Sequence, residues 1–202
     1  MPARSAVRRW LIDARFAAGA AVLPPRVAWF QLRARRLARR SGDVFSLTST
    51  TRPPDLRTLL VVARGRRRVV ELGTATGWTA ISLALADPRR SVLSCDVIER
   101  AEPTRYLGLV GQDVRARIEL AIRSGSDGPP DSAPVDLLYI DSSHDRRQTI
   151  DEVRAWRPAL PPGSVIVFDD YTHPEFSGVR EAVAELGLAG RRRGTLFVHR
   201  VS

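Results

Sequence analysis

The sequence predicts an α/β fold with a mostly parallel sheet, helices on both of its faces and an antiparallel last strand. From residue 69 onward, short apolar runs alternate with segments of helical periodicity. Strands buried on both faces of a parallel sheet have this nearly continuous apolar composition, because crossover helices cover both sides. The chain of 202 residues is close to the usual size of one domain.

Each expected element rests on a local pattern. Apolar residues three and four positions apart predict helices at residues 3–18, 27–40, 78–85 and 179–186, and a less regular pattern with two glycines occupies residues 101–116. Strands are expected at residues 69–72, 92–97, 118–122, 135–140, 165–168 and 194–198. The last strand follows its helix after a short segment with an arginine-rich turn at residues 191–193, so we expect it to pair antiparallel.

Cysteine count and charge exclude several protein classes. Cys95 is the single cysteine, so no internal disulfide or cysteine-based metal cage can form, and a reducing cytoplasmic location fits best. All 32 residues of the Lys and Arg class are arginines. Residues 1–68 hold 16 of them and three aspartates, which gives this segment a net charge of +13, whereas residues 69–202 have a net charge of −3. We therefore do not expect the α/β domain to bind nucleic acid. No apolar run approaches the ~18–20 residues that span a bilayer.

The basic N-terminal third predicts a helical extension, residues 1–45, before the α/β domain of residues 46–202. Two prolines separate its amphipathic helices, and we expect this hairpin to be a cap or the interface of a homodimer. Docking to a membrane surface or to an anionic substrate is the alternative. A twin-arginine export signal is disfavoured, because Asp13 and Arg15 interrupt the apolar run.

Polar residues gather where the expected strands end, which is where open doubly wound sheets bind ligands. Gly73 and Gly77, after the first strand, let the backbone approach a ligand closely. A dinucleotide-binding turn needs another glycine where this chain has Ala75. Asp96 stands 23 residues after Gly73, where a carboxylate can accept hydrogen bonds from a ribose diol. The spacing favours an adenosine ligand without a pyrophosphate, such as S-adenosylmethionine.

Five motifs resemble those of class I S-adenosylmethionine-dependent methyltransferases over residues 51–200: E-L-G-T-A-T-G-W-T, S-C-D, S-G-S, Y-I-D-S-S-H-D and F-D-D-Y. The nearest pattern is similar to metal-dependent O-methyltransferases of the catechol and macrocin type, and size and motifs also resemble the mycobacterial methylmannose polysaccharide 1-O-methyltransferases. The resemblance implies a Rossmann-like methyltransferase fold, S-adenosylmethionine and Mg²⁺ as cofactors, and a hydroxyl of a small molecule or saccharide as acceptor. It implies donor contacts from Thr51, Glu71, Gly73, Gly77, Trp78, Thr79, Asp96, Gly125, Ser126 and Asp141.

Three carboxylates, those of Asp141, Asp169 and Asp170, are expected to meet at adjacent strand ends. In a low-dielectric cleft they repel one another unless a cation neutralises them, and oxygen ligands suit Mg²⁺. The resemblance implies the same three metal positions. A structural alternative stays open, in which Asp141 caps the following helix and Asp170 faces solvent.

His144 is the expected catalytic base, because an imidazole with a pKa of about 6.5 can take a proton from a hydroxyl acceptor. The catechol enzymes have a lysine at the corresponding position, and the alternative role of His144 is a hydrogen bond at the start of a helix. His173 either lines the acceptor pocket or shapes its loop, and His199 is expected to be structural.

Two rival functions belong to other classes. A nicotinamide-dependent oxidoreductase is disfavoured by Ala75 and by the lack of any lysine for a hydride-transfer pair. A non-catalytic module would use the N-terminal arginines to bind RNA or a membrane surface, with affinity that falls steeply as salt rises.

Overall fold

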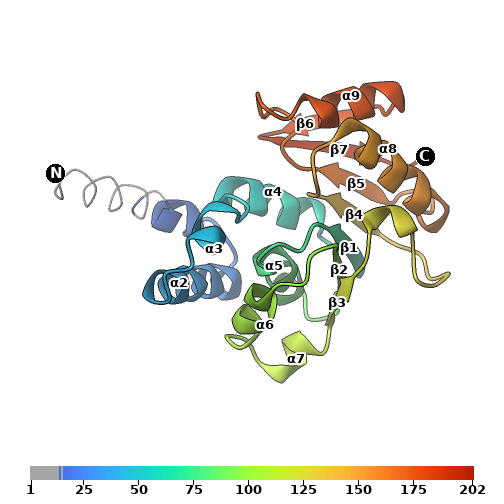
Figure 1. Cartoon of the computed structure of the whole chain (residues 1–202). Helices are drawn as coiled ribbons and strands as arrows, with labels where there is room; N and C mark the ends of the chain where they lie inside the picture. Colours follow the sequence, from blue (N-terminus) through green and yellow to red (C-terminus); the bar gives the residue numbers. More distant parts are fainter. Residues whose placement is uncertain (1–13, 15) are drawn as a thin grey trace.

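One seven-stranded sheet forms the centre of the protein (Figure 1). In this computed structural model, which describes residues 14 and 16–202, the strand order is β3-β2-β1-β4-β5-β7-β6. The strands are β1 (Arg68–Leu72), β2 (Ser91–Asp96), β3 (Ile118–Ile122), β4 (Leu137–Ile140), β5 (Val165–Phe168), β6 (Gly190–Arg193) and β7 (Leu196–Arg200). β1 to β5 pair in parallel, whereas β7 is antiparallel to both β5 and β6. The predicted mostly parallel sheet with an antiparallel last strand is confirmed.

The strand order reverses between β1 and β4. The chain runs outward from β1 through β2 to β3, then crosses back to β4 and continues to β5 on the other side. Leu72 pairs with Ile140, so the loops after β1 and β4 leave the carboxyl edge of the sheet side by side. Open α/β sheets bind their ligands in the crevice at such a reversal.

Helices cover both faces of the sheet (Figure 1). One face carries α2 (Pro25–Arg40), α3 (Val44–Thr48), α4 (Pro53–Val62), α5 (Trp78–Ala86), α6 (Ala101–Leu107) and α7 (Gln112–Arg115). The opposite face carries α8 (Arg146–Trp156) and α9 (Ser177–Glu185), with the short 3-10 helices η1 (Gly125–Asp127) and η2 (Arg157–Ala159) beside α8.

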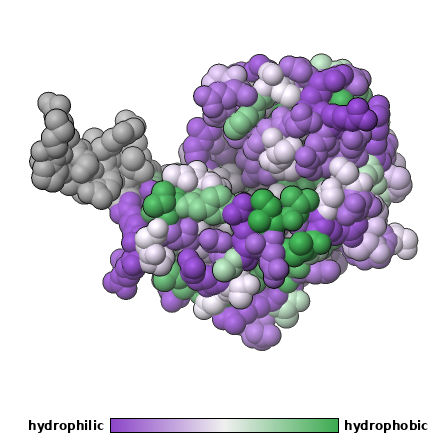
Figure 2. Space-filling model, in the orientation of Figure 1, coloured by the Kyte–Doolittle hydropathy of each residue, from purple (hydrophilic) through white to green (hydrophobic). Residues whose placement is uncertain are grey.

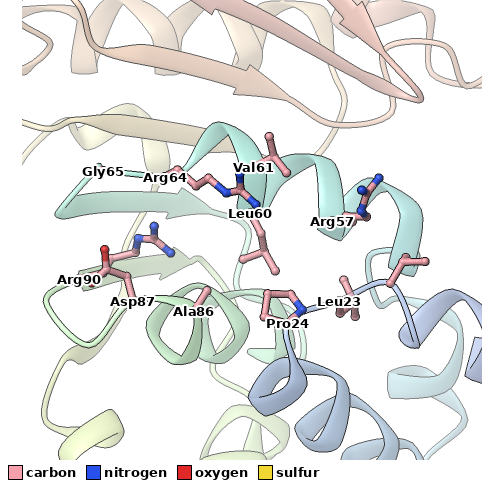
Figure 3. Close-up of a pocket in the computed structure, with 11 residues that line it drawn as sticks. Leu23, Pro24, Arg57, Leu60, Val61, Arg64, Gly65, Ala86, Asp87 and Arg90 are labelled. Atoms are coloured by element: carbon pink, nitrogen blue, oxygen red, sulfur yellow. The ribbon is translucent and has the colours of Figure 1, made fainter.

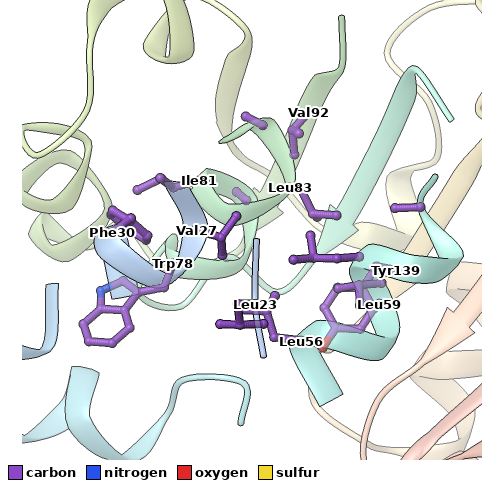
Figure 4. Close-up of a cluster of buried hydrophobic side chains, with 14 of the residues drawn as sticks. Leu23, Val27, Phe30, Leu56, Leu59, Trp78, Ile81, Leu83, Val92 and Tyr139 are labelled. Atoms are coloured by element: carbon purple, nitrogen blue, oxygen red, sulfur yellow. The ribbon is translucent and has the colours of Figure 1, made fainter. Parts of the chain in front are cut away.

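Strand residues contribute alternately to two hydrophobic cores, because successive side chains of a strand point to opposite faces. Val69 belongs to the first core, in which Val92 and Tyr139 pack with Trp78 (Figure 4). Val70 packs with Trp156 and Val179 in the second. Each fully buried aliphatic side chain contributes about 1.5–3 kcal/mol, so the two layers together hold the sheet in place.

The N-terminal region packs into the first core. The structure does not describe residues 1–13 and 15. The disfavoured export signal and most of the helix expected at 3–18 therefore lie outside the described residues. Residues 16–20 are helical. α2 buries Phe30 with its ring 6.4 Å from that of Trp78, and Gln31 Nε2 donates to Ser82 Oγ at 2.9 Å. Residues of α2 therefore share a core with α5 and the sheet.

Several elements differ from the sequence prediction, most by one or two residues at their ends. The helix expected at residues 101–116 is divided into α6 and α7, because Gly108 and Gly111 interrupt it. β4 begins two residues later than expected. The expected arginine turn is the exposed edge strand β6, and Gly194, with φ of +65°, makes the turn into β7. Backbone pairing with β7 forms this strand without any apolar pattern, and charged side chains on an edge discourage pairing with other chains.

The visible surface is mainly hydrophilic, with apolar side chains gathered at a few places (Figure 2). Large exposed apolar residues include Trp29 on α2 and Val97, Ile98 and Ile122 beside the carboxyl edge of the sheet. In the described part of the chain, no helix combines the length and the apolar character that crossing a membrane requires.

Candidate active site

The loop after β1 lies so close to the loop after β4 that only glycine fits at its first position. Gly73 has φ of +103°, and a Cβ there would overlap the carbonyl group of Asp141. Gly77, also left-handed with φ of +75°, precedes α5, and the backbone N–H of Ala75 donates to Asp96 Oδ2 at 2.9 Å. The glycine-rich loop is thereby fixed to both neighbouring strands.

A cavity of about 280 Å³ opens at this edge of the sheet. Its walls include four of the residues expected at the donor, namely Gly73, Asp96, Gly125 and Asp141. The walls also include Arg100, Arg123, Ser142, Gln148 and Glu152, which the sequence motifs did not identify. An adjoining hollow of about 160 Å³ shares Asp96 and is lined by Ile98, Leu120 and Ile122. The strand-end prediction therefore matches a real concavity.

Glu71 lies beneath this cavity and is fully buried. Ser94 Oγ donates to its carboxylate, and Thr74 Oγ1 lies 2.7 Å from the same hydroxyl. Burial, with smaller contributions from the charges of Asp141 and Asp96, raises the pKa of Glu71 to about 8 despite the hydrogen bond from Ser94. Glu71 is thus largely protonated at neutral pH.

The remaining expected donor residues lie outside the cavity wall. Trp78 is in the first core, 1% exposed, with its ring 5.1 Å from that of Tyr106, because the helical stripe of α5 faces inward. Its expected donor contact stays a prediction. Thr51 Oγ1 lies 2.9 Å from Thr79 Oγ1, so these two residues form a pair. Ser126 is exposed in η1, where its N–H donates to Ser124 Oγ at 3.2 Å.

Two of the three expected carboxylates, those of Asp141 and Asp169, contact the hydroxyl of Tyr139, which is the third residue of β4. The Tyr139 hydroxyl donates to Asp169 Oδ2 at 2.7 Å and lies 3.2 Å from Asp141 Oδ2. Burial and the charge of Asp141 raise the pKa of Asp169 to about 7. Burial also raises the pKa of Asp141, and the charge of Asp170 adds to this effect. Burial therefore disfavours the charged form of both carboxyl groups.

His144 faces this cluster from the loop after β4. Its Nε2 lies 3.4 Å from Asp141 Oδ1 and 3.5 Å from Asp170 Oδ2, without hydrogen-bond geometry, and forms an ion pair with them only when the imidazole is protonated. Burial would lower the pKa of His144, but the neighbouring carboxylates of Asp141, Asp170 and Asp169 outweigh it, and the pKa is raised.

Backbone strain marks the same edge of the sheet. Ala75, His144 and Asp170 are the three non-glycine residues with positive φ in the described part of the chain, at 44°, 59° and 49°. Such conformations are uncommon and cluster at functional sites.

The donor chemistry of the cluster fits a hard divalent cation, because carboxylate oxygens are its preferred ligands. Burial, with a smaller contribution from the neighbouring carboxylates, raises the pKa values of Asp141 and Asp169, and a bound cation would offset this cost of burying two carboxylates. Within residues 14 and 16–202, however, no three His, Cys, Asp or Glu side chains are arranged as a formed metal-binding group.

Two other hollows lie away from the strand ends. A pocket of about 370 Å³ between α4 and α5 is lined by Arg57, Arg64, Leu60 and the buried Arg90 (Figure 3). Arg90 donates to the carbonyl oxygens of Arg66, Leu83 and Ala63, which is a structural role. A groove of about 500 Å³ beside α2 is mainly apolar. Neither contains an expected site residue, so the carboxyl edge remains the candidate site.

A family profile matches the part of the sequence that forms the carboxyl edge of the sheet. A profile described as a methyltransferase domain matches residues 70–171, about half of the chain. The chain belongs to this methyltransferase-domain family. The matched segment runs from β1 to the residue after Asp170 and therefore contains the cavity and the carboxylate cluster.

Several solved structures share this fold. An O-methyltransferase from Bacillus cereus in complex with SAH has a TM-score of 0.69 and 16% identity, covering 94% of this chain and 99% of its own. A Streptomyces achromogenes O-methyltransferase of tomaymycin synthesis, in complex with SAM, has a TM-score of 0.64 and 21% identity, with coverages of 84% and 90%. A TDP-rhamnose 3'-O-methyltransferase of calicheamicin biosynthesis has a TM-score of 0.59 and 18% identity, with coverages of 72% and 78%. No curated protein sequence matches the chain.

Sequence reasoning missed two aromatic residues of this methyltransferase domain. Tyr139 lies within an apolar strand and was taken as part of it; its position two residues before Asp141 is the signal that could have identified it. Phe176 lies in the loop after β5, where its ring stacks on that of His144 at 4.5 Å. The imidazole of His173 also stacks on the Phe176 ring. His199 lies on β7 with Nδ1 2.7 Å from the carbonyl oxygen of Ala189.

Proposed function

We propose that this methyltransferase-domain protein transfers a methyl group from S-adenosylmethionine to a hydroxyl oxygen, with Mg²⁺ held by Asp141, Asp169 and Asp170. The observation that carries the proposal is the position of Asp141, which lines the cavity and also belongs to the carboxylate cluster beside His144. A donor in that cavity therefore lies next to the groups that can act on an acceptor.

The cavity suits an adenosine-containing donor. Asp96 is available to a ribose diol while its two oxygens are held by the N–H groups of Ala75 and Ile98. The adjoining hollow, with Ile98 and Ile122 at its wall, offers an apolar surface for a flat base. Ala75 takes the place of the glycine that a pyrophosphate requires, which favours S-adenosylmethionine over a dinucleotide.

His144 is proposed as the base of the reaction. The acceptor oxygen attacks the methyl carbon, the carbon–sulfur bond of the sulfonium breaks, S-adenosylhomocysteine leaves, and the hydroxyl proton passes to Nε2 of neutral His144. The carboxylates of Asp141 and Asp170 stabilise the resulting imidazolium. Bound Mg²⁺ would supply Lewis-acid chemistry that lowers the pKa of the acceptor hydroxyl. Alignment of donor and acceptor can contribute roughly 7–11 kcal/mol to such a transfer.

The acceptor in this proposal is a saccharide or another small molecule, with the 1-hydroxyl of a methylated mannoside as the first choice. The motif resemblance supports this choice, and a saccharide substrate is described for one protein of similar fold. We also propose a homodimer in the reducing cytoplasm, where buried Cys95 stays a free thiol.

Calorimetry and a transfer assay test the proposal together. The protein should bind S-adenosylhomocysteine and not NADH, and it should transfer labelled methyl from S-adenosylmethionine to a member of a mannoside, rhamnoside and catechol panel. EDTA should abolish turnover and Mg²⁺ should restore it. Asp96→Asn should weaken donor binding, whereas the control Asp151→Asn, at an exposed position on α8, should not. NADH binding without S-adenosylhomocysteine binding would contradict the proposal.

A further inference from the structure

Phe176 lies between the two histidines of the candidate site. Its ring is stacked on the His144 imidazole, with centroids 4.5 Å apart and planes at 12°. It is also stacked on the His173 imidazole, at 4.4 Å and 25°. A flat contact on one face fixes the plane of an imidazole, so rotation of the His144 ring would break this stack.

The loop that carries Phe176 is itself held in place by backbone hydrogen bonds. The N–H of His173 donates to the carbonyl oxygen of Asp170 at 2.8 Å, and the N–H of Phe176 donates to that of His173 at 3.2 Å. The N–H of Glu175 reaches His173 Nδ1 at 3.3 Å. Phe176 is therefore attached through a short, closed segment to Asp170, which is one of the carboxylates that His144 faces.

A backbone contact also constrains the segment that begins at His144. The start of α9 lies against residues 144–146, and a Cβ at Gly178 would be 2.6 Å from the backbone nitrogen of Arg146. Glycine therefore permits α9 to approach the loop in which His144 has φ of +59°. Side-chain stacking and this close helix contact act on the same histidine from one short segment, residues 176–178.

We propose that Phe176 is a positioning residue for His144: its ring holds the imidazole so that Nε2 stays directed at Asp141 and Asp170. The kinetic consequence rests on the proposed function of His144 as the base. The geometric consequence does not, because the ring contact exists whether or not the acceptor has been identified. The two can therefore be tested separately.

Nuclear magnetic resonance tests the geometric part. The chain has three histidines, so three Cε1–H signals from ¹³C-labelled histidine can be assigned with single substitutions. Protons above the face of a ring are shifted upfield; we expect the signals of His144 and His173 to be upfield of the His199 signal at the same degree of protonation. Phe176→Leu should move the first two downfield and leave His199 in place. A His144 signal unchanged by Phe176→Leu would overturn the proposal.

Enzyme kinetics test the consequence. Misplacement by about 1 Å can reduce a rate ~10²-fold, so Phe176→Leu should lower kcat by about ten- to a hundredfold while the dissociation constant for S-adenosylhomocysteine stays within about twofold. Phe176→Tyr keeps the stacked ring and should restore both kcat and the upfield signal. The control Val179→Ala removes buried packing from the same helix, where Val179 is 3% exposed, and should leave the His144 signal and kcat nearly unchanged.

The outcomes separate the two proposals. If Phe176→Leu shifts the His144 signal but keeps the wild-type kcat, the ring contact does not contribute to the reaction: the kinetic part of the proposal is refuted and the transfer activity stands. If Val179→Ala lowers kcat as much as Phe176→Leu does, general loss of packing explains the effect and the positioning role is refuted. If the wild-type protein methylates no acceptor, the proposed function fails, and the His144 signal still decides whether Phe176 orients the ring.

Discussion

Glu71→Gln should make the protein more stable at pH 8 than the wild type, with a difference that disappears in acid. The carboxyl group is fully buried, and its pKa is raised from 4.5 to about 8, first by burial. In the unfolded chain the group loses its proton near pH 4.5, whereas in the folded chain it keeps the proton up to about pH 8. The folded state then binds more protons than the unfolded state, so stability falls as pH rises through this window.

The size of the change in unfolding free energy follows from the pKa shift of Glu71. Each pH unit between the two pKa values changes the unfolding free energy by about 1.36 kcal/mol, so the wild type should lose at most about 4 kcal/mol from this group between pH 5 and 8. Glutamine has nearly the same shape and does not ionise, so the variant avoids this loss. Native domains are stable by only about 5–15 kcal/mol, which makes the difference easily measurable.

Urea denaturation at pH 5, 6, 7 and 8 measures the unfolding free energy of both proteins. The difference in unfolding free energy between Glu71→Gln and the wild type should grow steadily across this series, because other titrating groups are common to both proteins. Glu119→Gln, at an exposed position on β3, is the matched control and should show no growth. A difference that is the same at pH 5 and pH 8 would refute the reasoning about the buried acid.

The remaining predictions concern activity and packing. His144→Ala should lower kcat by about 10²–10⁴-fold, the usual contribution of a general base, with S-adenosylhomocysteine affinity retained in calorimetry; an unchanged kcat removes His144 from the reaction. Asp169→Asn should make residual turnover equal in EDTA and in Mg²⁺, and a wild-type response to Mg²⁺ would argue against the metal site. Trp78→Phe should lower the unfolding free energy by less than the ~3–5 kcal/mol that is typical of truncation to alanine, because the buried indole Nε1 has no hydrogen-bond partner to lose. The same substitution should leave donor affinity unchanged, because the indole lies in the core. Loss of donor affinity in Trp78→Phe would place this side chain in the donor site.

The sequence predicted best what depends on local pattern. β5 has the expected bounds, 165–168, because a continuous apolar run is the direct signature of a strand buried on both faces. β6 was missed because an edge strand is formed by backbone pairing, and its arginines carry no apolar alternation. Trp78 shows a different limit: a residue at the start of a helix can face a ligand or the core, and only the packing of α2 against α5 decides between them.

Within the candidate site, the types of the residues could be predicted from the sequence, but the directions in which their side chains point could not. Carboxylates at the ends of β4 and β5 could be placed at one edge, because parallel strands end together. The direction of His144 Nε2 depends on left-handed backbone at His144 and Asp170 and on the ring of Phe176, and none of these leaves a periodic trace in the sequence. The candidate site residues lie mainly in irregular loops, and the strands bring these loops together at one edge of the sheet.

The tight contact of Gly73 with the Asp141 carbonyl divides the site into a part that can be redesigned and a part that cannot. Any side chain at Gly73 would displace the Asp141 backbone, so the loop of the proposed donor cavity and the proposed acceptor side of the site cannot move independently at that point. Ile98 and Ile122, by contrast, are 50% and 59% exposed at the outer wall. Smaller residues there would enlarge the opening for synthetic donors with bulky base substituents, while the linked inner half stays intact.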